Sequence, residues 1–425
     1  MRAAWVGIVL ASGAAAQDLG PLPEFAPVDP LRAKLGQLLF YDPILSGNKN
    51  ISCGTCHHPD LGTGDGVSLS IGEGGIGLGP KRIIDAANVP EQRIPRNAPA
   101  MWNLGALEFQ VMFHDGRLEA DPNEPDGIRT PLGSEMTSGF DSVLSAQAMF
   151  PVLSPDEMAG HYSENEISQA VRLGFLSSEG GAWDLIAARV ADVPAYQQEF
   201  AKVVPGEEIT FPLIANLVAD FIRFEWRADN SLFDQAMRGE FEMPAEAARG
   251  MALFYGEAGC ASCHSGWFQT DHDFHAIGLP QIGPGKAARF ESHAQDTGRM
   301  RVTGDPADAY AFRTPSLRNV TITAPYGHNG AYADLGDMIR HHINVEEAFA
   351  SYDLAKAHLP AFPGANDLQA MSADETSAIL ASNVLAPSAL SEADISDLIS
   401  FLETLEDPAK RFGVPEAVPS GLPLD

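Results

Sequence analysis

The sequence has few cysteines, few basic residues and no long apolar stretch beyond its first residues. Its 425 residues include only 4 cysteines, and 27 lysines and arginines stand against 57 aspartates and glutamates, so that the net charge is −30. Such an acidic surface repels nucleic acid and anionic membranes, and it favours a basic or locally basic partner protein. No later stretch is apolar enough to cross a bilayer. We therefore expect no nucleic-acid partner and no membrane span.

The N-terminus has the pattern of a secretory signal. Arg2 supplies a positive charge, a short apolar run begins at Ala3, and Ala14-Ala15-Ala16 before Gln17 forms a small-residue cleavage site. We expect residues 1–16 to be this signal and the remaining chain to work in the periplasm.

All four cysteines belong to two copies of one motif. Residues 53–57 read C-G-T-C-H and residues 260–264 read C-A-S-C-H. C-x-x-C-H is the attachment pattern of haem c, in which both thiols bond to the haem and the histidine becomes an axial ligand of the iron. No cysteine remains for a disulfide. The sequence thus predicts two covalent haem c groups, one on Cys53, Cys56 and His57 and one on Cys260, Cys263 and His264.

The residues before each motif also repeat. G-x-x-L-F-Y occurs at 36–41 and again at 250–255, in each instance shortly before the haem motif. This pattern indicates the duplication of a cytochrome c-like unit. We therefore expect a mainly α fold with long ordered loops and two cytochrome c-like haem domains, residues 17–235 and 236–425.

Local patterns predict several elements. Leucines at helical spacing predict a helix over 31–41, and a further helix is expected from a Ser391 cap to Thr404. A capping pattern at Ser163 opens a mainly helical stretch that extends to residue 229. Residues 58–99 are rich in glycine and proline and predict a long loop. The residues between Val345 and Leu390 match no pattern with a role.

The sixth ligand of the first iron decides between catalysis and electron transfer. An iron with two strong axial ligands transfers electrons, whereas an open iron can bind a small molecule. His58 adjoins the proximal His57 and cannot reach the opposite face. No histidine or methionine occurs from Pro59 to Ala100. The first iron is therefore expected to be open.

The second iron has more candidate ligands. Met338, His341 and His342 follow the second motif on one expected helix, and Tyr332 lies nearby. Histidine and methionine are common axial ligands, and tyrosine is a rarer one. The spacing alone does not choose among them.

Several segments resemble the bacterial di-haem cytochrome c peroxidase family, which includes MauG. They are LGQLLFYDPILSGNKNISCGTCHHP at 35–59, RNAPAMWN at 96–103, FHDGR at 113–117, LSPDEM at 153–158 and FRTPSLRNVTITAPYGHNG at 312–330. They occur in the family's order and cover most of the chain that follows the signal. The resemblance implies two haem c groups, one at a peroxidatic site and one that transfers electrons.

The resemblance also implies roles for individual residues. Glu157 falls at the family's distal acid–base glutamate, and Gln147 and Pro151 match positions that line its pocket. His342 lies where peroxidases of the family carry an axial methionine and MauG an axial tyrosine, so it is the expected sixth ligand of the second iron. The implied ligands of a calcium ion between the haems are Asn97, Thr323 and Pro325.

Two departures from the family pattern affect the expected chemistry. His114 stands where the family usually has a tryptophan between the haems, so electron flow is expected to be weaker or to use another route, with Trp102 nearby in sequence. The loop after the first motif lacks the histidine that ligates the first iron of typical peroxidases. The first site is therefore expected to be open at all times, as in MauG.

The leading interpretation is a periplasmic peroxidase that reduces hydrogen peroxide with electrons from a small redox protein, relayed through a low-spin second haem. Glu157 could take a proton from one peroxide oxygen and return it to the other. One alternative is a MauG-like enzyme that uses a high-valent di-haem state to oxidise a Trp or Tyr of a partner protein. Another is a di-haem electron carrier without catalysis, which predicts two low-spin haems.

Overall fold

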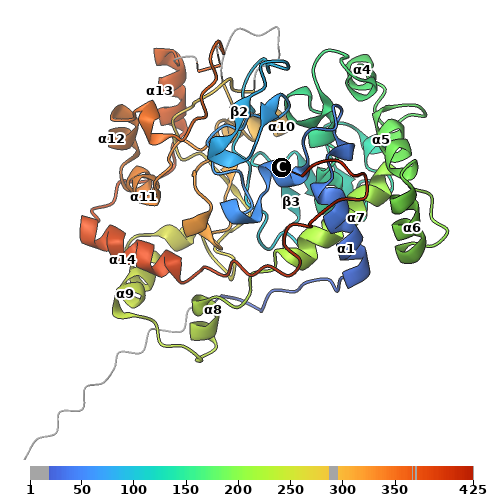
Figure 1. Ribbon diagram of the computed structural model, residues 1–425. Helices are drawn as coiled ribbons and strands as arrows, with labels where there is room; N and C mark the ends of the chain where they lie inside the picture. Colours follow the sequence, from blue (N-terminus) through green and yellow to red (C-terminus); the bar gives the residue numbers. More distant parts are fainter. Residues whose placement is uncertain (1–18, 287–294, 366, 369–370, 425) are drawn as a thin grey trace, which may run out of the picture.

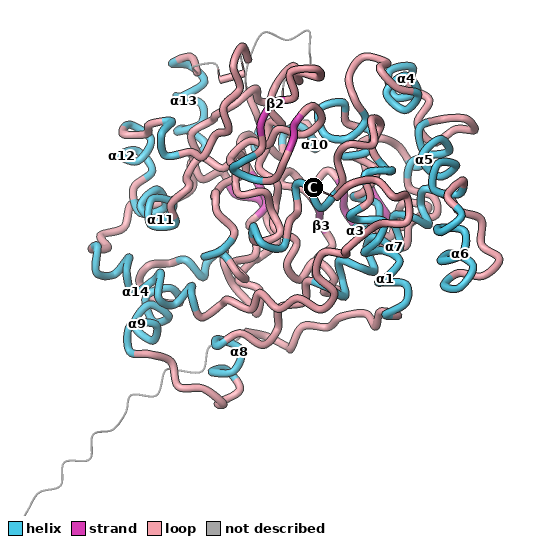
Figure 2. The backbone as a smooth tube through the Cα atoms, viewed as in Figure 1, coloured by secondary structure: helices cyan, strands magenta, loops and turns pink. Residues whose placement is uncertain are grey.

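The computed structural model describes residues 19–286, 295–365, 367–368 and 371–424, and the expected signal at 1–16 lies outside them. Helices predominate, strands are short, and long loops connect them (Figures 1 and 2). The first seven helices are α1 Pro30–Tyr41, α2 Cys53–Cys56, α3 Val143–Gln147, α4 Glu166–Leu173, α5 Ala182–Ala191, α6 Pro194–Val203 and α7 Phe211–Glu225. The remaining seven are α8 Leu232–Met237, α9 Ala245–Phe254, α10 Met300–Thr303, α11 Leu335–Ile343, α12 Val345–Ala350, α13 Ala373–Ser382 and α14 Glu392–Glu403. The mainly α fold predicted from the sequence is confirmed at this level.

Three small antiparallel sheets occur among the described residues. β1 pairs with β2, β3 with β4 and β4 with β5, and β6 with β7; Phe274 lies opposite Arg313 in the last pair. The strands are β1 Gly75–Ile76, β2 Ile83–Ile84, β3 Val111–Met112, β4 Leu118–Ala120, β5 Ile128–Arg129, β6 Phe274–His275 and β7 Phe312–Arg313.

The first half is organised by the crossing of α1 and α7. A Cβ at Gly36 would overlap the carbonyl oxygen of Leu217, so only a glycine lets the two backbones approach this closely. The ring of Phe221 on α7 lies 5.2 Å from that of Phe40 and 6.0 Å from that of Tyr41, measured between centroids. The crossing thus holds the end of α1 just before the first haem motif.

The second half repeats these contacts between α9 and α14. A Cβ at Gly250 would overlap the carbonyl oxygen of Asp397. The ring of Phe401 lies 5.1 Å from that of Phe254 and 6.0 Å from that of Tyr255. The repeated G-x-x-L-F-Y pattern is therefore a structural repeat with the same helix crossing in each half.

The two largest hydrophobic clusters follow the halves of the chain. One contains buried residues between Leu35 and Ala228, joined by Phe268 and Val418, and the other contains residues between Phe233 and Leu405. The expected division between residues 235 and 236 falls within α8, whose Phe233 packs in the second cluster.

The helix caps confirm one prediction and correct another. Ser391 caps α14 as expected and forms a capping box with Asp394. At α4, however, the cap is Asn165, whose side-chain oxygen accepts the Ser168 N–H at 2.8 Å. The predicted cap at Ser163 was wrong, because its φ of 66° is left-handed and an N-cap residue is extended.

The segment after α12 leaves the second half and packs on the first. Arg93 pairs with Asp367 at 2.5 Å, and it also donates to the carbonyl of Pro360 at 2.7 Å. Ser68 and His358 exchange hydrogen bonds at 2.8 Å. The residues between Val345 and Leu390 therefore anchor the long loop that follows the first haem motif.

The C-terminal tail also returns from the second half of the chain to the first, where it runs over α7 and α1 (Figure 1). The backbone N–H groups of Phe412 and Gly413 donate to the buried carboxylate of Glu225 at 2.7 and 2.8 Å. Ser420 donates to the buried Asp42 at 2.7 Å. Across the described part of the chain, no helix has the length and apolarity that a membrane crossing needs.

Replacing Gly36 or Gly250 with Ala should destabilise the fold by about 1–3 kcal/mol each, because the added methyl group forces two helix backbones apart. The free energy of unfolding of the haem-loaded protein, measured by urea titration with circular dichroism, tests this. The control is Gly336→Ala on α11, where a Cβ would meet only side-chain atoms, at 3.0 Å and beyond. An equal effect of all three substitutions would contradict the close crossing.

Candidate functional site

The first haem motif sits where α1 ends. A Cβ at Gly54 would overlap the ring of Tyr41, so the helical turn Cys53–Cys56 lies directly on that ring. The Nδ1 atom of His57 lies 3.0 Å from the carbonyl oxygen of Thr63. Because a carbonyl only accepts hydrogen bonds, Nδ1 carries the proton and Nε2 keeps a lone pair for a metal.

The second motif holds its histidine in the same way. Nδ1 of His264 lies 3.0 Å from the carbonyl oxygen of Gln269. Thr63 and Gln269 share a left-handed backbone, with φ of 66° and 49°, which turns each carbonyl back toward its histidine. Both motifs therefore hold their histidine through a hydrogen bond from Nδ1 to a backbone carbonyl.

The surroundings of the motifs fit covalently bound haem. None of the four cysteines forms a disulfide, and they and the two histidines keep accessible surface. Burial nevertheless raises the pKa of Cys53 to about 12 and of Cys260 to about 11, and it lowers the pKa of His264 to about 4. Two thiols and one imidazole in each motif match the donor set of haem c.

Glu157 lies on a π-helix, Pro155–Ala159, that two loops clamp from opposite sides. The N–H of Glu73 donates to the Asp156 carbonyl at 3.1 Å, and that of Gly47 donates to the Met158 carbonyl at 2.7 Å. A Cβ at Gly72 would overlap the Asp156 oxygen. This close contact fixes the position of the turn.

The charge environment places Glu157 beside the first motif. Burial raises its pKa, and the positive charges of Lys286 and Arg117 oppose this shift. Glu157 also lies near enough to Cys56 for its charge to raise the pKa of that thiol. The guanidinium of Arg117 stacks 5.0 Å from the ring centroid of Phe113. A carboxyl whose pKa is raised by burial could exchange a proton with a ligand of the first iron.

Gln147 and Pro151 lie on the segments that lead into the Glu157 turn. Gln147 is the last residue of α3, and Pro151 begins a short 3₁₀-helix that ends two residues before Pro155. The Gln147 carbonyl accepts the N–H of Phe150 at 3.3 Å. Both predicted pocket positions are thus close to Glu157 along the chain.

The two histidines of α11 differ in their hydrogen bonds. His341 is fully buried, and both its nitrogens are engaged, Nδ1 with the Tyr332 hydroxyl at 3.1 Å and Nε2 with the Ile277 carbonyl at 2.8 Å. His342 donates from Nδ1 to the Met338 carbonyl at 2.9 Å, and no described residue is hydrogen-bonded to its Nε2. A charge on His342 lowers the pKa of His264, which places the two imidazoles near each other.

His114 lies in the seam between the halves, which we define as segments 96–119 and 296–313. Its Nε2 donates to the Asn97 carbonyl at 3.2 Å, and its own carbonyl accepts the Arg313 N–H at 2.7 Å. Burial lowers the pKa of His114 to about 4, so the ring is neutral near pH 7. Trp102 is buried and donates to the Gly62 carbonyl at 3.1 Å.

The predicted calcium ligands adjoin the loop at 62–68. The Asn97 amide nitrogen donates to the Val67 carbonyl at 3.1 Å, which leaves the amide oxygen for another partner. Thr323 packs so closely on Gly62 that a Cβ there would lie 3.0 Å from its Cα, and Pro325 follows two residues later. Neutral oxygens of this kind suit Ca²⁺.

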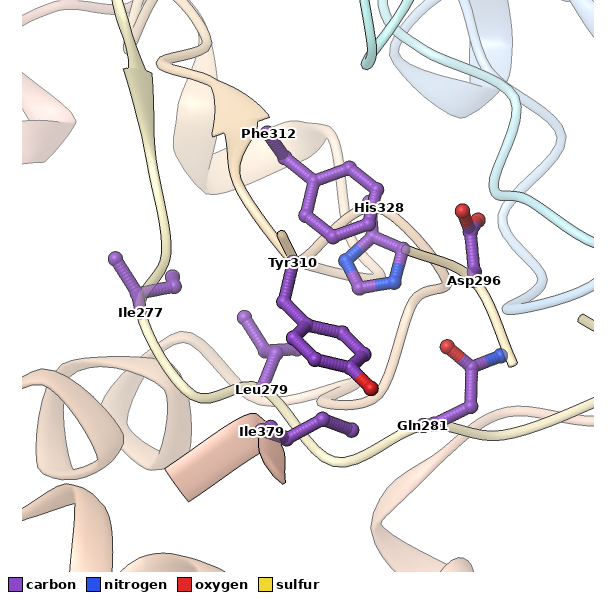
Figure 3. A pocket seen from close by; sticks show the side chains of 8 residues that line it. All are labelled: Ile277, Leu279, Gln281, Asp296, Tyr310, Phe312, His328 and Ile379. Carbon is purple, nitrogen blue, oxygen red and sulfur yellow. The ribbon is translucent and has the colours of Figure 1, made fainter. Parts of the chain in front are cut away.

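Sequence reasoning missed a pocket in the second half beside the seam. The ring of His328 stacks on that of Phe312 at 3.6 Å, and Tyr310 extends between the pocket walls (Figure 3). Burial lowers the pKa of His328 to about 3. Only its place in the G-H-N-G segment could have singled it out. The residues lining the pocket are Ile277, Leu279, Gln281, Asp296, Tyr310, Phe312, His328 and Ile379.

The chain is similar to several known proteins. A family model described as di-haem cytochrome c peroxidase matches residues 30–242. The methylamine utilization protein MauG of Methylorubrum extorquens is 29% identical over 401 residues, which are 93% of this chain and 84% of that protein. The cytochrome c551 peroxidase of Nitrosomonas europaea is 29% identical over 77% of each chain. The crystal structure of the diheme peroxidase BthA from Burkholderia thailandensis shares the fold, with a TM-score of 0.61, 20% identity and coverage of 94% of this chain and 91% of that one.

Replacing Gly72 with Ala should loosen the Glu157 turn, because the new methyl group overlaps the carbonyl oxygen that Glu73 holds in place. Hydrogen–deuterium exchange should then speed up in the peptide that spans residues 154–160, by about tenfold or more for a local opening. Gly336→Ala serves again as the control. Unchanged exchange in this peptide would show that the clamp does not fix the turn.

Proposed function

Because the chain belongs to the di-haem cytochrome c peroxidase family, we propose that it reduces hydrogen peroxide at the first haem with electrons relayed through the second. The chain is an oxidoreductase, and its family carries two haem c groups. The observation that carries the proposal is the difference between the surroundings of the two motifs. The carboxyl of Glu157 is desolvated near the first motif, whereas near His264 of the second motif His342 uses only its Nδ1 in a hydrogen bond to a described residue.

Glu157 acts as the proton carrier of the reaction. The bound haem supplies an iron that accepts peroxide and exchanges electrons with it. The Glu157 carboxylate takes the proton from the peroxide oxygen nearer the iron and returns it to the outer oxygen, which leaves as water. The clamped π-helix holds the carboxyl in place, and Gln147 and Pro151 line the same pocket and limit the entry of water.

His342 closes the second site as the sixth ligand of its iron. Its Nδ1–H bond to the Met338 carbonyl orients the ring and leaves Nε2 for the metal. His341 is unsuited to this role because both its nitrogens are already bonded. Held by both His264 and His342, a bound haem would supply electron transfer rather than a binding site for peroxide. Neutral His114 fills the seam between the haems.

The calcium site and the partner follow from the same chemistry. Asn97, Thr323 and Pro325 supply neutral oxygens for a calcium ion between the haems. A periplasmic location suits covalent haem attachment. The net charge of −30 favours an electron donor with a basic docking face.

A MauG-like activity is the second candidate function. The loop after the first motif carries no histidine or methionine that could close the first iron, and the likeness to MauG extends over 93% of the chain. Such an enzyme would use the oxidising power of peroxide on a Trp or Tyr of a partner protein.

Steady-state turnover of peroxide with a reduced basic cytochrome c tests the proposal directly. A peroxidase should consume peroxide and oxidise two cytochromes for each peroxide, over many turnovers. Negligible turnover, with slow return of the peroxide-oxidised protein to its resting spectrum, would favour the MauG-like function. Two low-spin haems in the ferric spectrum would overturn both and leave an electron carrier.

Replacing Glu157 with Gln should slow the reaction with peroxide by about 10²–10⁴-fold, because the proton carrier is lost. Stopped-flow mixing with peroxide measures the rate, and the pyridine haemochrome assay confirms that both haems are attached. The control is Asp156→Asn, which removes the same charge one residue away, from a carboxylate that accepts a hydrogen bond from Gln92. An unchanged rate in the Glu157 variant would exclude its assigned role.

Replacing His342 with Ala should convert the second haem from low spin to high spin, because its iron loses a strong ligand. Electron paramagnetic resonance of the ferric protein reports both spin states. His341→Ala is the matched control on the adjacent residue and should leave the second haem low spin. The opposite result, a spin change in the His341 variant alone, would transfer the ligand role to His341.

A further inference from the structure

Buried arginines of this acidic chain are in general closely paired. Arg93 donates to Asp367 at 2.5 Å, and Arg318 donates to Asp234 at 2.6 Å. Arg82 instead donates to three backbone carbonyls, at 2.5 to 2.7 Å. Such pairing is expected, because a buried cation without a counter-charge is strongly unfavourable.

Arg313 on β7 departs from this rule. Its Nε donates to the Phe113 carbonyl at 3.3 Å and one terminal nitrogen donates to the Thr314 carbonyl at 3.2 Å, both longer than the bonds of the other buried arginines. No carboxylate among the described residues forms an ion pair with it. Burial lowers the pKa of Arg313 to about 10, and no nearby carboxylate counteracts this shift. Arg313 is only half-buried, so part of its surface remains accessible.

Lys286 is a second cation of this kind. It is desolvated enough that its pKa falls to about 8, yet it keeps accessible surface. In the part of the chain that the structure describes, no acidic group lies within ion-pair distance of its ammonium. The carboxylates that act on its charge are those of Glu157 and Asp296, and Asp296 is already paired with Arg96.

The two cations lie beside different haem motifs. The backbone of Arg313 on β7 lies opposite that of Phe274 on β6. The carbonyl of the adjacent Thr314 accepts a hydrogen bond from the Thr270 hydroxyl at 2.8 Å. Thr270 follows Gln269, whose carbonyl holds His264 of the second motif. Lys286 belongs to a segment in which Gly283 packs against Leu69 of the first half, and its charge acts on Glu157 beside the first motif.

We propose that Arg313 and Lys286 are the counter-charges of the haem propionates, Arg313 at the second haem and Lys286 at the first. Attachment through C-x-x-C-H uses the vinyl groups of a haem and leaves its two propionate carboxylates free. A propionate supplies the negative charge and the acceptor oxygens that these cations lack among the described residues. A guanidinium can bind a carboxylate through two parallel hydrogen bonds, and an ammonium binds it as a point charge.

The test compares Arg313→Gln and Lys286→Gln with Lys202→Gln in the haem-loaded protein. Lys202 is the control because it is exposed, pairs only with Glu199 and carries the same charge. Resonance Raman spectroscopy reports the propionate bending mode of each haem, and spectroelectrochemistry reports the midpoint potential of each haem. Neither readout depends on turnover.

Arg313→Gln should shift the propionate mode and lower the midpoint potential of the second haem alone, because a nearby cation favours the ferrous state. Lys286→Gln should do the same at the first haem alone. Arg313→Lys should keep the potential near that of the wild type while still shifting the mode, since only one hydrogen bond replaces two. This variant also keeps the test decisive if Arg313→Gln fails to fold.

Two outcomes would overturn the proposal. One is that the Arg313 and Lys286 variants, folded and with both haems attached, match Lys202→Gln in both measurements. The other is that removing chloride and phosphate raises the midpoint potentials of the wild type but not those of the Arg313→Gln and Lys286→Gln variants, because a small inorganic anion would then be the partner of these cations.

Discussion

The contact of two helix backbones, repeated once in each half, is the constraint on which the molecule depends. Gly36 on Leu217 and Gly250 on Asp397 leave no space for a side chain, so α1 and α9 cross α7 and α14 at one fixed place. The aromatic residues that end α1 and α9 then pack on a phenylalanine of the partner helix at nearly equal distances. Because each haem motif follows directly, the crossing determines where the thiols and the proximal histidine lie. The position of each haem motif is therefore set by the steric contact between two helices and not by the cysteines and histidine of the motif itself.

On this repeated base the two sites differ through elements that do not repeat. Among the described residues, a π-helix held by two loops occurs in the first half and not in the second, and it carries Glu157 near Cys56. In the second half, α11 brings an imidazole toward His264 instead. One scaffold can thus present a proton-transferring group at one haem and a closing ligand at the other. The two haem sites can therefore differ in role through these local elements alone, because the sides that carry the cysteines and the proximal histidine are alike.

The seam joins the halves mainly through charge. Arg96 binds Asp115 of its own half and Asp296 of the other, and Arg313 reaches the carbonyls before and at His114. The segment around Asp367 and the C-terminal tail add hydrogen bonds that cross from the second half to the first. Buried ion pairs are sensitive to geometry, so this seam resists sliding of the halves. A fixed separation between the haem motifs suits electron transfer from one to the other.

The sequence by itself determined the two haem motifs and the repeated helices, because their ligands, caps and apolar spacing lie within a few consecutive residues. It could not separate His341 from His342. Adjacent residues of a helix point about 100° apart, and only the contacts with Tyr332 and Ile277 decide which ring keeps a free nitrogen. The Ser163 cap failed for a similar reason, since the chain there turns into a left-handed conformation. The unpaired charges of Arg313 and Lys286 were also decided by tertiary structure alone, because a missing counter-charge is a property of neighbours that the fold brings from distant parts of the chain.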